Sequence, residues 1–332
     1  MAEYLINATD LTKVASAIKE KGGTSAPLVY PGGFVSAIQA IQTGAPLQII
    51  VTTIAGAAVK AMKDSKTVSG TADASGNCTL TVDETGTWTV AATNGSTTKT
   101  ADVVVGTANV DLIMIDPVFG NNSWAAIIKA CQEKQVPDTW NVGNSCNMTI
   151  NNKTYAIDII GKNHDDYADG SGKAPLTFQL HNSYGTAYAM KSTSTNVGGW
   201  KECAMRKTHL PTVLALMPAE VQSGIREVSK ITLSRDTSGI PTMDTTSDKL
   251  FLLSEVEVFN STEYSASGEG SQYAYYGASG STVKTLNGKG TSWWLRSPMS
   301  TSDYTFCASS VGGEQTHLRA TDERGVAFAF CF

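Results

Sequence analysis

Two acidic residues that alternate with valine, Glu255 and Glu257, are the first candidates for chemistry in this sequence. In a strand, residues two apart point to the same face, so the pattern predicts two carboxylates side by side. Paired carboxylates are what a glycosidase uses to cleave a sugar linkage. Charged residues on the solvated face of a half-buried strand are the commoner explanation, so the pair is weak evidence for catalysis.

The segment 164–172 groups three more carboxylates, Asp165, Asp166 and Asp169, with glycines at 170 and 172. Oxygen-rich loops that contain glycine can hold calcium, although this spacing is not that of an EF-hand. Turns in which aspartate side chains cap the backbone are commoner. We therefore expect no metal and no cofactor, with a structural calcium ion as the minor alternative.

Nucleophilic catalysis has no visible signature. The sequence contains no G-x-S-x-G motif, and its four histidines show no H-E-x-x-H spacing. We therefore predict no catalytic residues and a protein that is not an enzyme.

The stretch 299–324 carries side chains suited to recognition. Tyrosine, histidine, arginine, leucine and aspartate occur there on neighbouring positions, the mixture that paratope-like surfaces use. Core-sized aromatic residues flank or interrupt the stretch at positions 293, 294, 306, 328 and 330, so a rigid frame is expected around it. The candidate ligand-binding residues are Ser302, Tyr304, Thr305, Ala308, Ser310, Thr316, His317, Leu318, Arg319, Thr321, Asp322 and Arg324. The alternative is a solvated loop beneath a different binding edge.

The elements that position these residues begin with two short amphipathic helices, predicted over 10–21 with Asp10 as N-cap and over 34–42. Such short helices must dock on each other or on a partner to bury their apolar faces. The wording LTKVASAIKEKGGTSAPLVYPGGFVSAIQAIQ resembles the N-terminal attachment or oligomerisation segment of siphophage tail and baseplate proteins. An ordinary helical hairpin is the alternative, and residues 1–46 form this first segment.

Period-two runs over 47–110, namely LQIIVTTI, NCTLTVD, GTWTVAAT and KTADVVVG, predict a small β-sandwich with Trp88 in its core. It is similar to the immunoglobulin-like or prealbumin-like spacers of phage and surface proteins. We favour a stalk over a carbohydrate-binding module, because fold alone assigns no site. Residues 111–140 are expected to be a linker with one helix, SWAAIIKACQEK.

Residues 141–332 are expected to form one large domain of the α+β class. It contains the strands NMTINNKTYAIDIIG and DKLFLLSEVEVFN and helices around GGWKECAMRKTHL, PTVLALMP and PAEVQSGIREV. The words KNHDDYADGSGKAPLTFQL, NVGGWKECAMR, SWWLRSP and the terminal GVAFAFCF together resemble C-type-lectin-like domains that are abundant in phages and prophages of gut Gram-positive bacteria. The resemblance implies a fold like that of formylglycine-generating enzymes, although the cysteine pair of their copper site is not recognisable.

Members of this family resemble the variable proteins of diversity-generating retroelements, in which adenine-directed mutagenesis rewrites a segment near the C-terminus. Carried over, that segment is 299–324. An asparagine codon with its adenines replaced can encode most of the candidate residues. It cannot encode Met299, Glu314, Gln315 or Glu323, which must be template constants or come from other codons.

Composition excludes several other classes. The net charge of −5 and the lack of a Lys/Arg cluster argue against nucleic acid as a partner. No apolar run approaches eighteen residues and no signal peptide is recognisable, so we expect neither membrane insertion nor export by a signal of its own. The six cysteines show no CxxC spacing and are expected to be buried thiols, with a Cys307–Cys331 bridge left open.

The sequence thus predicts a tail-tip adhesin of a phage or prophage virion that binds a host bacterial surface protein or glycan. The N-terminal segment would contact other tail or baseplate proteins, and a homotrimer is expected because repeated sites gain avidity. Two alternatives remain: a tail-associated polysaccharide or peptidoglycan hydrolase that pairs Glu255 with Asp165 or Asp166, and a structural baseplate protein.

Overall fold

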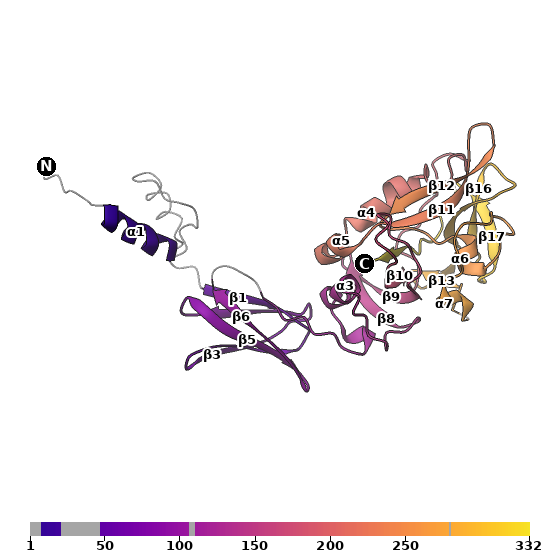
Figure 1. Cartoon of the computed structure of the whole chain (residues 1–332). Coiled ribbons are helices and arrows are strands. Elements are labelled where there is room, and N and C mark those ends of the chain that lie inside the picture. The colour runs from indigo at the N-terminus through magenta and orange to yellow at the C-terminus, as the bar shows by residue number, and fades with distance from the viewer. Residues whose placement is uncertain (1–7, 21–46, 106–109, 279) are drawn as a thin grey trace. The chain divides into compact units, whose positions relative to one another are not determined.

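The computed structural model describes residues 8–20, 47–105, 110–278 and 280–332. The chain mixes helix and sheet, with strands predominating. It divides into two compact units, Met1–Met114 and Ile115–Phe332 (Figure 1). Within the described ranges, no helix is both long and apolar enough to cross a bilayer.

The first unit contains helix α1 (Ala8–Glu20), as the sequence predicts. Leu11, Ala15 and Ile18 are less exposed than the residues between them, which is the expected amphipathic pattern, although Val14 is exposed. Asp10 lies in the first turn and is not the N-cap, because the helix begins two residues earlier. The helix predicted over 34–42 lies outside the described residues.

Two sheets around one core make up the other described residues of this unit, so the β-rich character predicted for 47–110 is confirmed. The strands are β1 (Leu47–Thr52), β2 (Ala58–Lys63), β3 (Lys66–Thr71), β4 (Asn77–Val82), β5 (Gly86–Asn94), β6 (Thr97–Val105) and β7 (Val110–Asp111). Their orders are β4-β1-β7 and β3-β2-β5-β6. Trp88 is fully buried in the core, as expected. Hairpin β2–β3 was not predicted.

Residues 115–140 are not a linker, and the structure corrects that expectation. The 3-10 turn η1 (Phe119–Asn121) and helix α3 (Trp124–Gln132) belong to the second unit. Phe119, Trp124 and Trp140 are buried in its core. The predicted helix is confirmed, with the Ser123 hydroxyl accepting from the Ala126 N–H as its N-cap.

The second unit is built on a sheet in the order β18-β10-β9-β8. Its strands are β8 (Ser145–Ile150), β9 (Lys153–Lys162), β10 (Leu176–Leu180) and β18 (Ala329–Cys331). Asn151 and Asn152 both adopt positive φ, so the run predicted as one strand is a hairpin with a two-residue turn. The last strand lies beside β10, and Phe330 stacks on Phe178 with ring centroids 5.4 Å apart.

A second sheet, β15-β16-β17, and two hairpins complete the unit. The sheet consists of β15 (Trp293–Pro298), β16 (Thr305–Ser309) and β17 (Gln315–Arg319), and the hairpins of β11 (Val228–Arg235) with β12 (Pro241–Asp248) and β13 (Lys284–Leu286) with β14 (Lys289–Thr291). The helical elements are η2 (Met205–His209), α4 (Leu210–Leu214), α5 (Ala219–Gly224), α6 (Glu255–Phe259) and α7 (Ala274–Gly277). The five predicted aromatic anchors are fully buried.

The run DKLFLLSEVEVFN is not a strand throughout. Phe251 forms an isolated bridge with Ala329, and Ser254 then caps helix α6. Ser254 accepts from the Glu257 N–H while the Glu257 carboxylate accepts from the Ser254 N–H, a complete capping box. The prediction that Glu255 and Glu257 share one face of a strand is therefore wrong, because both residues lie in helix α6.

All six cysteines are buried and unbridged, including Cys307 and Cys331. This confirms the expectation of buried thiols. The two C-terminal cysteines lie on different strands, β16 and β18, of different sheets.

Truncation of Phe330 should lower the stability of the second unit, because the last strand, β18, is part of its core. We expect Phe330→Ala to lower the free energy of unfolding by about 3–5 kcal/mol, the usual cost of a large aromatic cavity. Urea titration followed by tryptophan fluorescence measures this change, since the ring centroids of Trp124 and Phe330 are 6.2 Å apart. Val311→Ala, at a 54% exposed position, is the control and should change little. Equal shifts for the two variants would contradict the core role of β18.

Candidate functional site

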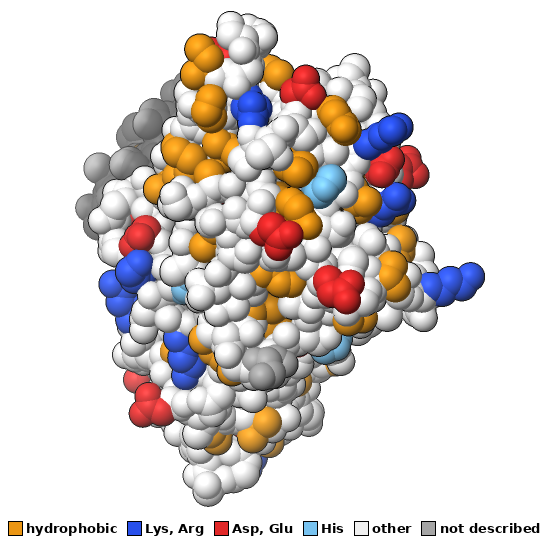
Figure 2. Space-filling model, turned by 90° about the vertical axis from the view of Figure 1, so that its right-hand side faces the viewer, with side chains coloured by type: hydrophobic (Ala, Val, Ile, Leu, Met, Phe, Trp, Pro, Cys, Tyr) orange, Lys and Arg blue, Asp and Glu red, His pale blue; other side chains and the backbone are white. Residues whose placement is uncertain are grey.

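The structure separates the predicted ligand-binding residues by their exposure. The side of the second unit that carries β16 and β17 faces the viewer in Figure 2, where charged and hydrophobic side chains are interspersed. Exposed positions are Tyr304, His317, Arg319 and Thr321; partly exposed positions are Ser302, Ser310, Thr316, Leu318, Asp322 and Arg324; buried positions are Thr305 and Ala308.

Thr305 and Ala308 are corrected as contact residues. Both lie on β16, the central strand of its sheet, and they are only 4% and 0% exposed. A strand that is paired on both edges and covered on both faces cannot offer side chains to a receptor. Their small side chains belong to the packing of the sheet.

Strand β17 gives the exposed face its alternation. It is an edge strand, paired with β16 through Phe306↔Leu318 and Cys307↔His317. Leu318 packs partly against the core, whereas His317 and Arg319 point to the other face and are exposed. His317 meets the Tyr264 ring edge to face at 5.0 Å, so this side chain is positioned by a neighbouring loop.

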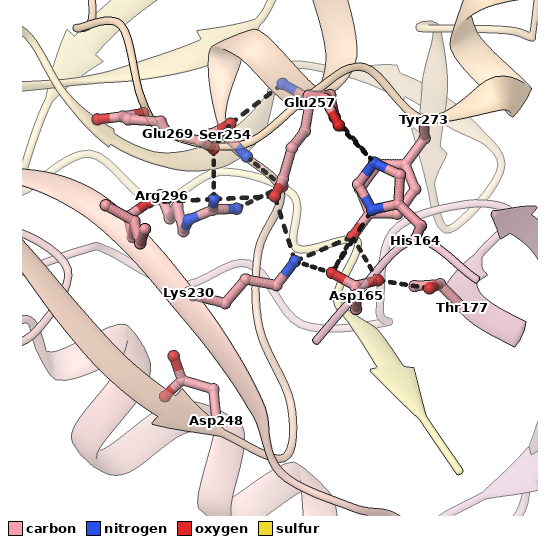
Figure 3. A network of polar contacts seen from close by, with 12 residues as sticks. His164, Asp165, Thr177, Lys230, Asp248, Ser254, Glu257, Glu269, Tyr273 and Arg296 are labelled. Carbon is pink, nitrogen blue, oxygen red and sulfur yellow. Dashed lines mark hydrogen bonds and ion pairs between the residues drawn. The ribbon is translucent and has the colours of Figure 1, made fainter. Parts of the chain in front are cut away.

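Behind this face lies a buried ionic network that the sequence analysis did not predict (Figure 3). Arg296 on β15 is 1% exposed and binds both carboxylate oxygens of Glu257. Its other donors reach the Thr232 hydroxyl at 2.9 Å and the carbonyls of Leu252 and Glu269 at 3.0 and 2.8 Å. One guanidinium thus connects β15, α6, β11 and two loops.

Lys230 on β11 extends the network to the acidic loop. Its ammonium contacts Asp165, the Glu257 carboxylate at 3.2 Å and the Tyr273 hydroxyl at 3.0 Å. The Tyr273 hydroxyl also lies 2.9 Å from each Asp165 oxygen, and the Thr177 hydroxyl donates to Asp165 as well. Each buried charge therefore has an opposite charge and several hydrogen bonds, as burial requires.

The surroundings lower the pKa of two carboxylates in this network and raise the pKa of a third. Burial opposes ionisation of Asp165, but Lys230 and His164 hold its pKa below the usual value. Burial likewise opposes ionisation of Glu257, and Arg296 and Lys230 lower its pKa. For Glu269 burial wins and raises the pKa to about 7, despite contacts with Arg296, the Ser297 hydroxyl and the Leu233 N–H.

A pocket of about 200 Å3 opens onto this network, and it tests the hydrolase alternative. Three carboxylates line it: Asp166, which is paired with Lys173 at 2.9 Å, and Asp165 and Glu257, which are both bound to Lys230. Neither of the latter two is a protonated acid, as a glycosidase needs. Glu255 is fully buried, does not line the pocket and accepts from the backbone N–H groups of Tyr264 and Ser265. The expected pairing of Glu255 with Asp165 or Asp166 in a cleft is not observed.

Ser271 and His164 also line the pocket without forming a nucleophile and its base. The His164 Nε2 lies 3.0 Å from the Ser271 carbonyl oxygen and 3.2 Å from its hydroxyl. An imidazole N–H that donates to the carbonyl cannot also accept the hydroxyl proton. The His164 Nδ1 is 3.7 Å from Asp165, too far for an orienting hydrogen bond.

The acidic loop does not gather its carboxylates around one point. Asp165 binds Lys230, Asp166 lies 2.9 Å from Lys173, and Asp169 binds Arg226. The Ser171 N–H donates to Asp169, which is the turn-capping role that the sequence favoured. Within the described ranges no group of three or more His, Cys, Asp or Glu residues comes together as a metal site. The residues present do not fit a calcium ion.

The sequence offered one signal for the missed network. The run WWLRSP has a single arginine among large apolar residues, and the structure buries every residue of the run. A buried arginine must be paired. The pattern does not reveal which of the 30 acidic residues is the partner, because Glu257 is 39 residues away along the chain.

Removing Arg296 should be costly, because Glu257 would lose its main partner in a dry environment. We expect Arg296→Met to lower the free energy of unfolding by roughly 3–5 kcal/mol, as for other broken buried pairs. Arg319→Met on the exposed face should change it by less than about 0.5 kcal/mol. Chemical denaturation of both variants measures the difference, and similar midpoints would refute the central role of Arg296.

Glu269 should make stability depend on pH. The pKa of the folded carboxyl is raised to about 7, whereas the ordinary pKa of a glutamate side chain is 4.5. The folded state therefore binds more protons between these values, and the free energy of unfolding should fall as pH rises through this window. Glu269→Gln should remove this slope, which amounts to about 3 kcal/mol at most for 1.4 kcal/mol per pKa unit. Denaturation from pH 4.5 to 8 is the measurement. A slope unchanged in the variant would exclude Glu269 as its source.

Comparison with known proteins gives one family match. Residues 177–332, slightly less than half of the chain, match the model of a family described as a domain of unknown function (DUF6273). The matched stretch begins in β10 and contains Lys230, Glu257 and Arg296 as well as the exposed face on β17. No curated protein and no solved structure matches this chain. What the sequence resembles in this region is thus a family whose activity is not described.

Proposed function

We propose that the chain is an adhesin of a phage or prophage tail that binds a host surface protein or glycan through exposed side chains of residues 302–324. One observation carries this proposal. Tyr304, His317 and Arg319 are exposed on or next to the sheet β15-β16-β17. The central strand of this sheet, β16, is completely buried, and Arg296 on β15 is held in an ionic network. Such a surface combines aromatic area, charge and hydrogen-bonding groups on a rigid support.

The separation between surface and framework supports the proposal. The side chains of Tyr304, His317 and Arg319 take no part in the ion pairs that hold the second unit together. Substitutions at these positions should therefore alter recognition without unfolding the domain. This is the property that a diversified binding surface requires.

The phage-tail, C-type-lectin and retroelement assignments rest on the resemblances of residues 11–42 and 141–332. Three of the four positions that the mutagenesis cannot produce have side chains that make hydrogen bonds, among them Glu314, whose carboxylate accepts from the Ser310 hydroxyl at 3.4 Å. The Met299 sulfur accepts from the Thr305 hydroxyl at 3.3 Å, and the Gln315 amide donates to Glu263. Constant residues at these places would hold the variable segment in register.

Assembly as a homotrimer through the N-terminal segment, with attachment to other tail or baseplate proteins, belongs to the same proposal. Three modest sites on one particle gain avidity without any new contact. Binding without catalysis is also favoured by the pocket, because each of the three carboxylates that line it, Asp165, Asp166 and Glu257, is paired with a lysine.

Binding to cells tests the proposal. We expect the variant Tyr304→Ala/His317→Ala/Arg319→Ala to lose at least about tenfold in affinity for host-type gut bacteria, since a few exposed aromatic and arginine residues dominate most interfaces. Flow cytometry of labelled protein on whole cells gives the measurement, and a urea titration checks that the variant is folded.

The matched control is Leu216→Ala/Glu220→Ala/Ser223→Ala. These exposed residues lie on or next to α5, which is on the other side of the second unit from β17 in Figure 1. The control should bind like the unaltered protein. If both triple variants bind equally well, the receptor site is not on the 302–324 face.

A further inference from the structure

A cleft of about 460 Å3 in the second unit is lined by three lysines, Lys134, Lys162 and Lys173. Asp138 and Asn163 add polar groups to its wall, and Val136 and Pro175 add apolar ones. The volume is in the range of small-molecule sites and exceeds what one inorganic phosphate fills. None of the lining residues belongs to 302–324, so this cleft is independent of the proposed receptor face.

The three lysines come from a turn after α3, from the end of β9 and from the loop before β10. Lys134 follows the end of α3, where its N–H donates to the Cys131 carbonyl at 3.1 Å and its φ is positive. Lys162 is the last residue of β9. Lys173 forms an isolated bridge with Asp166 and reaches the His164 carbonyl at 3.1 Å. Three segments of the chain thus contribute lysines to the lining of one cleft, although the ammonium of Lys173 is bound by Asp166 and the His164 carbonyl.

Two of these cations have no acidic partner. Within the described residues, no carboxylate lies within ion-pair distance of Lys134 or Lys162, and Lys162 makes only a 3.5 Å contact with the Asp138 carbonyl. Lys173 is paired with Asp166 at 2.9 Å. The lining therefore carries three positive charges and one negative charge, in a chain with a net charge of −5.

The chemistry of the wall defines the ligand. Unpaired ammonium groups attract a compact anion such as phosphate, for which lysine is a common binder. Asp138 repels a bare anion but accepts hydrogen bonds from hydroxyl groups, and the Asn163 amide both donates and accepts. We propose that this cleft binds the phosphate ester of a polyol or sugar, with the phosphate on Lys134 and Lys162 and the hydroxyls toward Asp138 and Asn163.

Isothermal titration calorimetry of the full chain at low ionic strength tests the proposal with glycerol 1-phosphate, inorganic phosphate, acetate and glycerol. We expect saturable binding of glycerol 1-phosphate that weakens by about fivefold for each lysine removed in Lys134→Gln and Lys162→Gln, the effect of one exposed charge at close range. The double variant Lys60→Gln/Lys289→Gln, which changes two exposed lysines outside the cleft and the net charge equally, should bind like the unaltered chain.

Asp138→Asn separates the ester from a bare anion. Removing the negative charge should tighten binding of inorganic phosphate several-fold while reducing the preference for glycerol 1-phosphate over it. A poly(glycerol phosphate) that binds many-fold more tightly per phosphate than the monomer would identify a polymer as the source, and equal affinity would identify the small ester. Absence of saturable binding, equal loss in the control variant, or acetate binding as tightly as the ester would overturn the proposal.

Discussion

The guanidinium of Arg296 and the carboxylate of Glu257 form the contact on which the second unit depends. Arg296 reaches β11, α6 and the loops around Leu252 and Glu269, and Lys230 carries the ion chain on to Asp165. These groups are almost fully buried, so each has lost its hydration and must be compensated inside the protein. The arrangement is satisfied only when the segments around positions 165, 230, 257 and 296 meet in one geometry.

That rigidity explains how the neighbouring surface can be free. Every residue of β15 and β16 is buried, so these two strands are held by the surrounding core. Within this sheet, β17 and the adjoining turns are the parts exposed to solvent. The packing of this sheet therefore does not depend on the exposed side chains of Tyr304, His317 and Arg319. A surface used for recognition has this property when its residues vary and its frame does not.

Charge placement also distinguishes two of the recesses of the second unit. In the pocket beside Lys230, acids and bases are paired, and Glu269, whose pKa is raised to about 7, is buried and does not line the pocket. In the cleft lined by Lys134 and Lys162, these two lysines have no acidic partner among the described residues, whereas the third, Lys173, is paired with Asp166. A paired site is already satisfied and gains little from a ligand, whereas an unpaired one gains the full interaction with an anion.

Local pattern alone determined several parts of this protein: the alternation in 86–94 and 97–105, the helix over 124–132 and the aromatic anchors from Trp293 to Phe330. These features depend on neighbours in sequence, so periodicity and residue size predict them. Tertiary contact decided the rest. Glu255 and Glu257 alternate as in a strand, yet a capping box at Ser254 begins a helix there. Thr305 and Ala308 are buried because β17 pairs beside their strand. Residues within 115–140 pack into the core of the second unit, and Arg296 binds Glu257, which is 39 residues away along the chain. Each of these outcomes depends on what packs against a residue, and a linear pattern does not contain that partner.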